Sequence, residues 1–164
     1  MLIFRGNDVQ VGTKPTGSSG SHLVQIVTTN NTTQYEITDS SYTNSQQVGV
    51  NITPVYSDSV LHVEVSACVN LYGGNNVNQI GVVGLYENNV GTIRAQTRVG
   101  STNDAASRDQ YSQCYLQYLG SSGTAGAAQT FGLAIRRYAN AYDNGVRIGQ
   151  DSFPTIVTIS EYGV

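Results

Sequence analysis

The sequence contains no tryptophan and a single lysine, and only 12% of its 164 residues are charged. An average globular protein carries roughly 25% charged residues, so the polarity here comes from Ser, Thr, Asn, Gln and 18 glycines. The formal net charge is -3, and Arg136–Arg137 is the densest positive spot. Nucleic-acid binding by counterion release needs cations gathered on one face. We therefore expect no direct binding of nucleic acid.

Long hydrophobic runs are also missing. No stretch approaches the roughly 18 uninterrupted apolar residues of a membrane span, and the apolar run Leu2–Phe4 is far too short for the core of a signal peptide. We expect no membrane insertion and a soluble chain made in a cytosol. Release together with a particle, rather than secretion, is the route by which such a chain can still reach the outside of a cell.

The residues that hold metals and cofactors are scarce. A zinc site needs three or four converging ligands, and the chain has only His22 and His62 to combine with Cys68 and Cys114. His62 and Glu64 share a strand face, which is more typical of an ordinary polar face, so we expect no metal and no cofactor. A cytosolic product usually keeps its cysteines reduced, and we expect two thiols, the alternative being a bridge between neighbouring strands.

Catalytic signatures are equally scarce. Neither histidine lies near a G-x-S-x-G elbow, and no spacing pairs the carboxylates as a glycosidase would need. Asp143–Gly145 and Asn103–Asp104 offer oxygen ligands for calcium, but they lack EF-hand spacing and match turn chemistry better. We expect a protein that is not an enzyme.

What is present is a period of two. The segment Val60–Asn70 is the clearest case. One face carries the apolar set Leu61, Val63, Val65, Ala67 and Val69, and the other carries His62, Glu64, Ser66 and Asn70. This alternation predicts a strand with one dry face and one wet face.

Similar runs recur along the chain, separated by Asn-Asn, Gly-rich and Asn-Gly breakers. The predicted strands are His22–Thr28, Gln34–Ile37, Val48–Thr53, Val60–Asn70, Gln79–Glu87, Thr92–Val99, Tyr111–Leu119, Thr130–Tyr138, Val146–Ile148 and Thr155–Tyr162. Glu87–Gly91 is the expected short hairpin. No window shows a helical stripe, so the fold class is all-β, an antiparallel β-sandwich.

Residues 1–20 differ from residues 21–164, which form the predicted β-sandwich domain. Leu2, Ile3, Phe4 and Arg5 precede a Gly/Ser/Pro-containing linker. We interpret them as an arm that binds a partner, the alternative being a terminus that folds back over its own sheet.

Tyr111 and Tyr115 line one face of a predicted strand together with Gln113 and Gln117, while Cys114, Leu116 and Tyr118 line the other. Exposed tyrosines beside Gln, Asn and Ser make good contact surfaces for proteins or sugars. Tyr111 and Tyr115 are therefore candidate surface contacts, although cross-strand packing accounts for most tyrosines in such sheets.

Three segments resemble known proteins. They are Val50–Pro54 with Ser57–Val65, Gln117–Thr124, and Pro154–Tyr162. In these segments the chain is similar to small fibre-head and capsid-decoration domains of tailed bacteriophages, including cyanophages. The resemblance implies a jelly-roll-like sandwich, usually trimeric, exposed on the virion and assembled in the host cytoplasm.

The expected role is a capsid decoration (cement) protein that binds the major capsid protein or another virion protein, because no extended shaft precedes the domain in this sequence. The alternative is the receptor-binding head of a tail or head fibre, which would bind a host-surface glycan. A more distant alternative is a polysaccharide hydrolase.

Overall fold

The computed structural model describes residues 10–11, 21–38, 40–42, 48–73, 79–101, 110–138, 144–149 and 153–163. Within these ranges the protein is all-β, and no helix there has the length and apolarity to cross a membrane. The strands are β1 (Gln10–Val11), β2 (His22–Asn31), β3 (Tyr35–Ile37), β4 (Val50–Ile52), β5 (Val60–Gly73), β6 (Gln79–Glu87), β7 (Asn89–Ser101), β8 (Gln110–Ser121), β9 (Gln129–Arg137), β10 (Asn144–Ile148) and β11 (Thr155–Gly163). Every predicted strand is present, and β1 is the one that the sequence pattern did not predict.

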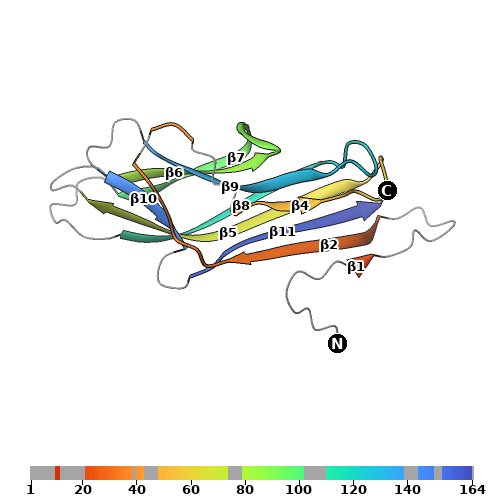
Figure 1. Cartoon of the computed structure of the whole chain (residues 1–164), viewed down its shortest axis with the longest axis horizontal. Coiled ribbons are helices and arrows are strands. Elements are labelled where there is room, and N and C mark those ends of the chain that lie inside the picture. Colours follow the sequence, from red (N-terminus) through yellow and green to blue (C-terminus); the bar gives the residue numbers. More distant parts are fainter. Residues whose placement is uncertain are drawn as a thin grey trace.

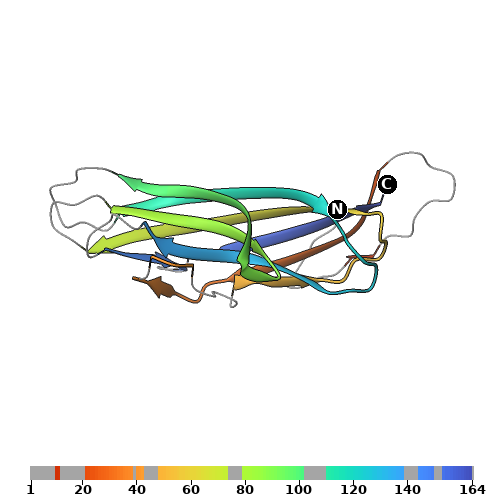
Figure 2. The same cartoon turned by 90° about the horizontal axis from the view of Figure 1, so that it is seen from above.

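The strands form two antiparallel sheets that run along the long axis of the molecule (Figure 1 and Figure 2). Four pairs define the fold: β2 with β11, β4 with β9, β5 with β8, and β6 with β7. The first of these eight strands thus pairs with the last, the second with the seventh, and so on inward. The resulting orders, β2-β11-β5-β8 in sheet A and β4-β9-β6-β7 in sheet B, are those of a jelly roll. The predicted jelly-roll-like sandwich is confirmed.

Three short strands extend sheet A. β1 pairs with β2 through Gln10 opposite Ile26 and Val11 opposite Gln25. β10 pairs with β5 over Val69–Gly73, beyond the point where β11 leaves it, and β3 pairs with the outer edge of β10. The long strand β5 therefore changes its partner on one side from β11 to β10 near residues 67–68.

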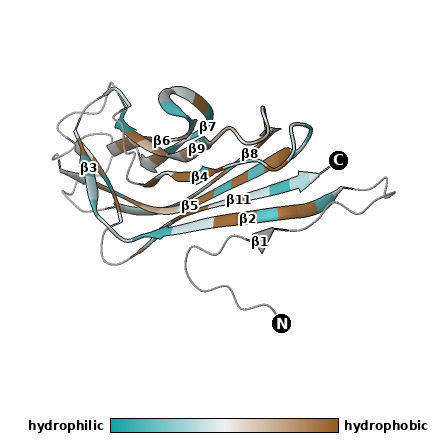
Figure 3. Ribbon diagram, turned by 45° about the vertical axis from the view of Figure 1, so that its right-hand side comes forward, coloured by the Kyte–Doolittle hydropathy of each residue, from teal (hydrophilic) through white to brown (hydrophobic). Residues whose placement is uncertain are grey.

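The core lies between the two sheets. The predicted dry face of β5, namely Leu61, Val63, Val65, Ala67 and Val69, is fully buried. It packs with apolar side chains of β6, β9 and β11, such as Leu85, Leu133 and Ile159. Figure 3 shows apolar and polar residues interspersed along β2, whose Val24 and Val27 are buried. Burying each such side chain stabilises the fold by about 1.5–3 kcal/mol, which is why the alternation determines which face of each strand turns inward.

The turn between β6 and β7 contains Asn88, whose φ is 60°. Asparagine adopts this left-handed conformation more readily than most residues because its short amide can hydrogen-bond locally. The backbone N–H of Asn88 also donates to the Thr130 carbonyl on β9, at 2.6 Å. The predicted hairpin at Glu87–Gly91 is confirmed.

The outer face of sheet B is partly covered by the segment that joins β3 to β4. A β-carbon on Gly84 of β6 would lie 3.0 Å from the Tyr42 hydroxyl. One on Gly132 of β9 would lie 2.7 Å from the α-carbon of Gly49. Glycine at these positions therefore allows the covering segment to approach closely, and Tyr86 beside Gly132 is completely buried.

Several predicted features lie outside the described residues. These are the arm residues Leu2, Ile3, Phe4 and Arg5, and the calcium alternatives Asn103, Asp104 and Asp143. Among the described residues, no group of three or more His, Cys, Asp or Glu side chains could hold a metal ion.

Candidate functional site

The outer face of sheet A is the surface on which the candidate contact residues lie. It is formed by alternate residues of neighbouring strands. They are Tyr111, Gln113, Tyr115, Gln117 and Leu119 of β8, His62, Glu64, Ser66 and Cys68 of β5, Ile156 and Thr158 of β11, and Ile26 and Thr28 of β2. Glu64 carries the one formal negative charge in this set, so this surface is nearly neutral.

Large apolar and aromatic side chains stand out from this face. Tyr111 is 48% exposed, Tyr115 is 55% exposed and Leu119 is 67% exposed. Phe153, which precedes β11, is 52% exposed. The opposite face of β8 is buried, with Cys114 and Leu116 in the core and Tyr118 packed against it. The predicted faces of this strand are confirmed, and Tyr111 and Tyr115 both lie on the outer one.

Tyr115 is held by hydrogen bonds to its neighbours. Its hydroxyl donates to Oε1 of Glu64 on β5, and Gln117 Nε2 donates to the Tyr115 hydroxyl at 2.7 Å and to Glu64 Oε1 at 3.3 Å. The hydrogen bond from Tyr115 lowers the pKa of Glu64, and the same bond raises the pKa of Tyr115. The carboxylate thus stays ionised and the phenol stays protonated, which fixes the ring in one orientation.

A second cluster lies on the same sheet where β3 and β10 extend it. Arg147 Nε donates to Glu36 Oε2 at 2.9 Å, and the Arg147 guanidinium carbon lies 3.4 Å from the centroid of the Tyr72 ring. The Tyr72 hydroxyl donates to the other carboxylate oxygen of Glu36. The two charges are paired with each other, so this end of the sheet also presents little net charge.

The two cysteines lie on opposite faces of sheet A. Cys114 is opposite Ala67 in the register and points into the core, where burial raises the pKa of its thiol to about 11. Cys68 is opposite Gln113 and lies on the outer face. Both are thiols in this structure, and their side chains point to opposite sides of the sheet.

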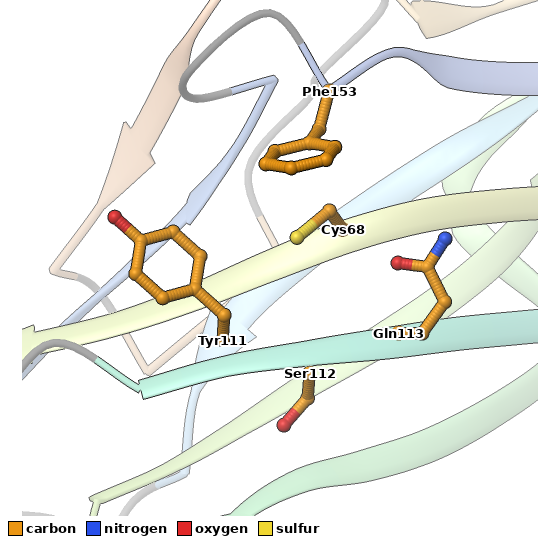
Figure 4. Close-up of a pocket in the computed structure, with 5 residues that line it drawn as sticks. All are labelled: Cys68, Tyr111, Ser112, Gln113 and Phe153. Atoms are coloured by element: carbon orange, nitrogen blue, oxygen red, sulfur yellow. The ribbon is translucent and has the colours of Figure 1, made fainter.

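A groove lies at the end of the outer face where β5 changes partner (Figure 4). It encloses about 460 Å³ and is lined by Cys68, Tyr111, Ser112, Gln113 and Phe153. The sequence patterns had identified Tyr111 as a contact residue, but they gave no role to Phe153 or Cys68. An aromatic residue directly before Pro154 and outside any predicted strand was the available signal for Phe153.

Asn70 differs from its predicted exposure. It belongs to the outer face as the alternation predicts, yet it is only 1% exposed. Its cross-strand neighbours are Tyr111 on β8 and Arg147 on β10, two large side chains that flank a short one. Neither Nδ2 nor Oδ1 of Asn70 has a hydrogen-bond partner.

No family model and no curated protein matches the sequence. Among solved structures, the chain is similar to VP2 of infectious bursal disease virus in a subviral particle, with a TM-score of 0.30, 14% identity and coverage of 95% of this chain and 46% of that one. A point mutant of the same VP2 in T=1 particles gives a TM-score of 0.27 at 14% identity, covering 98% and 44% of the two chains. VP2 in further T=1 particles gives 0.26 at 16% identity, with coverage of 98% and 44%. The chain thus spans less than half the length of these proteins, and at such TM-scores the likeness carries no conclusion about function.

Proposed function

We propose that this protein is a structural component of a tailed-phage particle, a decoration or cement protein on the exterior of the capsid. The supporting observation is the open outer face of sheet A, with its neutral, tyrosine-bearing surface. The outer face of sheet B, in contrast, is partly covered by the chain's own segment around Tyr42 and Gly49. Jelly rolls are common in viral capsid proteins and lectins, but a fold by itself does not determine function.

The chemistry of the outer face suits contact with another protein. Interface cores are depleted in charged residues and enriched in tyrosine, and the large apolar side chains that stand out here are Tyr111, Tyr115, Leu119 and Phe153. Tyr115 is already held in place by Glu64 and Gln117, so binding costs little side-chain entropy at that position. The proposed partner is the major capsid protein or another virion protein, and the proposed assembly is a homotrimer that forms in the host cytoplasm with the particle.

Co-sedimentation with particles that lack this protein tests the proposal. We expect the wild-type protein to pellet with such particles and the double variant Tyr115→Ser/Leu119→Ser to stay largely in the supernatant while keeping its melting temperature. Val55→Ser is the matched control, because Val55 is also an exposed apolar residue (38%) but lies in the β4–β5 loop and not on the outer face. Pelleting of the double variant at wild-type levels would show that the outer face is not the contact.

The second candidate function is the receptor-binding head of a fibre, and the groove beside Phe153 favours it. Comparing the binding of purified protein to empty capsids and to host cells separates the two functions. We propose no enzymatic activity for the protein. A reducing-sugar assay on host polysaccharide is expected to remain blank, and release of reducing ends would support the hydrolase alternative.

A further inference from the structure

The groove at the end of the outer face results from the partner change of β5. β11 pairs with β5 as far as Ser66, and β10 begins to pair with it at Val69. Cys68 lies at this junction, and its small side chain contributes to the lining together with Phe153 from the segment that leads into β11. The depression therefore lies where the sheet changes from one strand partner to the next.

Two aromatic rings border the groove. Tyr111 and Phe153 lie around the Cys68 thiol, with the Gln113 side chain on the third side, whereas Ser112 points away from them (Figure 4). Both rings are about half exposed, at 48% and 52%. Rings presented in this way offer flat apolar faces to a ligand, and no described residue that lines the groove is charged.

Gln113 is the amide side chain of the groove. It is exposed and is paired in the register with Cys68. Its amide can both donate and accept hydrogen bonds, so a ligand that carries groups of both kinds would pair with it. Asn70, on the same face of β5, is 1% exposed and does not line the groove, so it has no part in the site.

The geometry points to the groove as a binding site for a neutral saccharide. A sugar ring presents apolar C–H faces that stack on aromatic rings, and its hydroxyl groups donate and accept hydrogen bonds as the amide of Gln113 requires. The volume of about 460 Å³ lies within the range of pockets for small ligands, roughly 300–1,000 Å³. An apolar peptide side chain would offer the Gln113 amide no hydrogen bond, and a charged ligand would meet no counter-charge among the described lining residues.

The groove lies at one end of sheet A. His22 and Gly163 are paired at the other end, and the groove lies beyond the last pair between β11 and β5. The inference concerns the isolated protein and does not depend on the virion role.

The test is a titration of the full chain with glucose, galactose, mannose, N-acetylglucosamine and maltotriose, followed by ¹H–¹⁵N NMR of the side-chain amides. We expect at least one sugar to shift the side-chain amide signals of Gln113 and the backbone amide signals of the residues that line the groove, with a Kd on the order of 1 mM. Tyr111→Ala and Phe153→Ala should each weaken binding about fivefold or more, because each removes one stacking face. Gln113→Ala should also weaken binding, since it removes a hydrogen-bonding amide. Tyr115→Ala is the matched control: Tyr115 is an exposed tyrosine on the same strand that does not line the groove, and its loss should leave the Kd unchanged.

Three results would overturn the inference. The first is no shift of the Gln113 amide or of the other amide signals of the groove with any of these sugars up to about 50 mM, well above the expected Kd. The second is an equal loss of affinity in Tyr115→Ala and Tyr111→Ala. The third is that Phe153→Ala abolishes co-sedimentation with particles but leaves sugar binding intact, which would make the groove a protein contact. Melting curves of the variants show whether they are folded, and the half-exposed positions of both rings predict that they are.

Discussion

Replacing Glu161 perturbs a buried carboxylate that connects two parts of the sandwich. Glu161 lies on β11 with 0% exposure. Its Oε2 accepts a hydrogen bond from Gln25 Nε2 at 2.5 Å, and its Oε1 accepts the backbone N–H groups of Val55 and Tyr56 at 3.0 and 3.1 Å. The carboxylate therefore holds the loop between β4 and β5 against the β2–β11 pair.

The size of the effect follows from these bonds. Hydrogen bonds to a charged group contribute about 1.5–3 kcal/mol each, and they are not additive. Glu161→Gln replaces one accepting oxygen with an NH₂ group, which would face N–H donors in place of acceptors. We therefore expect the free energy of unfolding to fall by about 2–3 kcal/mol. Glu161→Ala leaves all three donors without an acceptor and opens a cavity, so we expect a loss of about 4 kcal/mol or more.

The pH dependence has a definite sign. Burial raises the pKa of Glu161, but the hydrogen bonds from Gln25 and the backbone outweigh it and hold the pKa below the ordinary value of 4.5. A carboxyl group whose pKa is lower in the folded state contributes stability that is fully present above its unfolded pKa and is lost as the pH falls through its folded pKa. The stability difference between wild type and Glu161→Gln should therefore be full near neutral pH and shrink below about pH 4.5.

Urea denaturation of wild type, Glu161→Gln and Glu161→Ala at neutral and acidic pH measures these differences. Glu64→Gln is the matched control, because Glu64 is also a strand glutamate with a lowered pKa but is half-buried on the outer face, next to Tyr115. Its replacement should cost much less. Equal losses in Glu161→Gln and Glu64→Gln, or a Glu161→Gln difference that grows as the pH falls, would refute the reasoning.

Three further predictions follow from the same structure. Val65→Asp should lower the free energy of unfolding by several kcal/mol, because it buries an unpaired charge in the core. His62→Ala, on the outer face, should change the melting temperature little. Equal melting temperatures of the two variants would contradict the assignment of the faces. Iodoacetamide near neutral pH should alkylate Cys68 well before Cys114, whose thiol is 2% exposed and has a pKa raised to about 11; peptide mass spectrometry measures the order, and faster reaction at Cys114 would contradict its burial. Deleting residues 1–20, which also removes β1, should leave a folded β-domain that no longer co-sediments with particles; wild-type co-sedimentation would show that the arm is not the anchor, and failure to fold would assign it to the domain's own sheet.

The strands could be predicted because their signals are local. The alternation along Val60–Asn70 and the Asn-Asn turn at Asn88 can each be recognised within a few residues. Burial of the apolar face of a strand stabilises the fold, which is why the alternation indicates the face that turns inward. β1 escaped prediction because two residues, Gln10 and Val11, carry no measurable period. The jelly-roll strand order depends on pairs such as β2 with β11, which join residues more than a hundred positions apart. The spacing of the strands indicated a sandwich or jelly roll, but no local pattern specifies which strands pair.

In the candidate site, too, some features could be predicted from local sequence patterns and others could not. The exposure of Tyr111 and Tyr115 followed from the alternation of β8. The burial of Asn70 depends on which side chains lie across from it, and these are known only once β8 and β10 are placed beside β5. Glu161 follows Val157 and Ile159 on the inner face of β11, but the groups that stabilise a carboxylate there, Gln25 and the loop that folds over it, come from distant parts of the chain. Long-range pairing produced these features, and no local pattern predicts them.

The pairing of His22 with Gly163 has a practical consequence. Directly paired α-carbons of antiparallel strands lie about 4.5–5.5 Å apart, so the eight jelly-roll strands, counted without β1, begin and end at nearly one point. Such a unit can be inserted as a cassette into a surface loop of an unrelated scaffold without forcing that loop apart. A fluorescent protein or an affinity tag fused beyond either strand would lie at the same pole of the molecule. The opposite pole would then remain free for display.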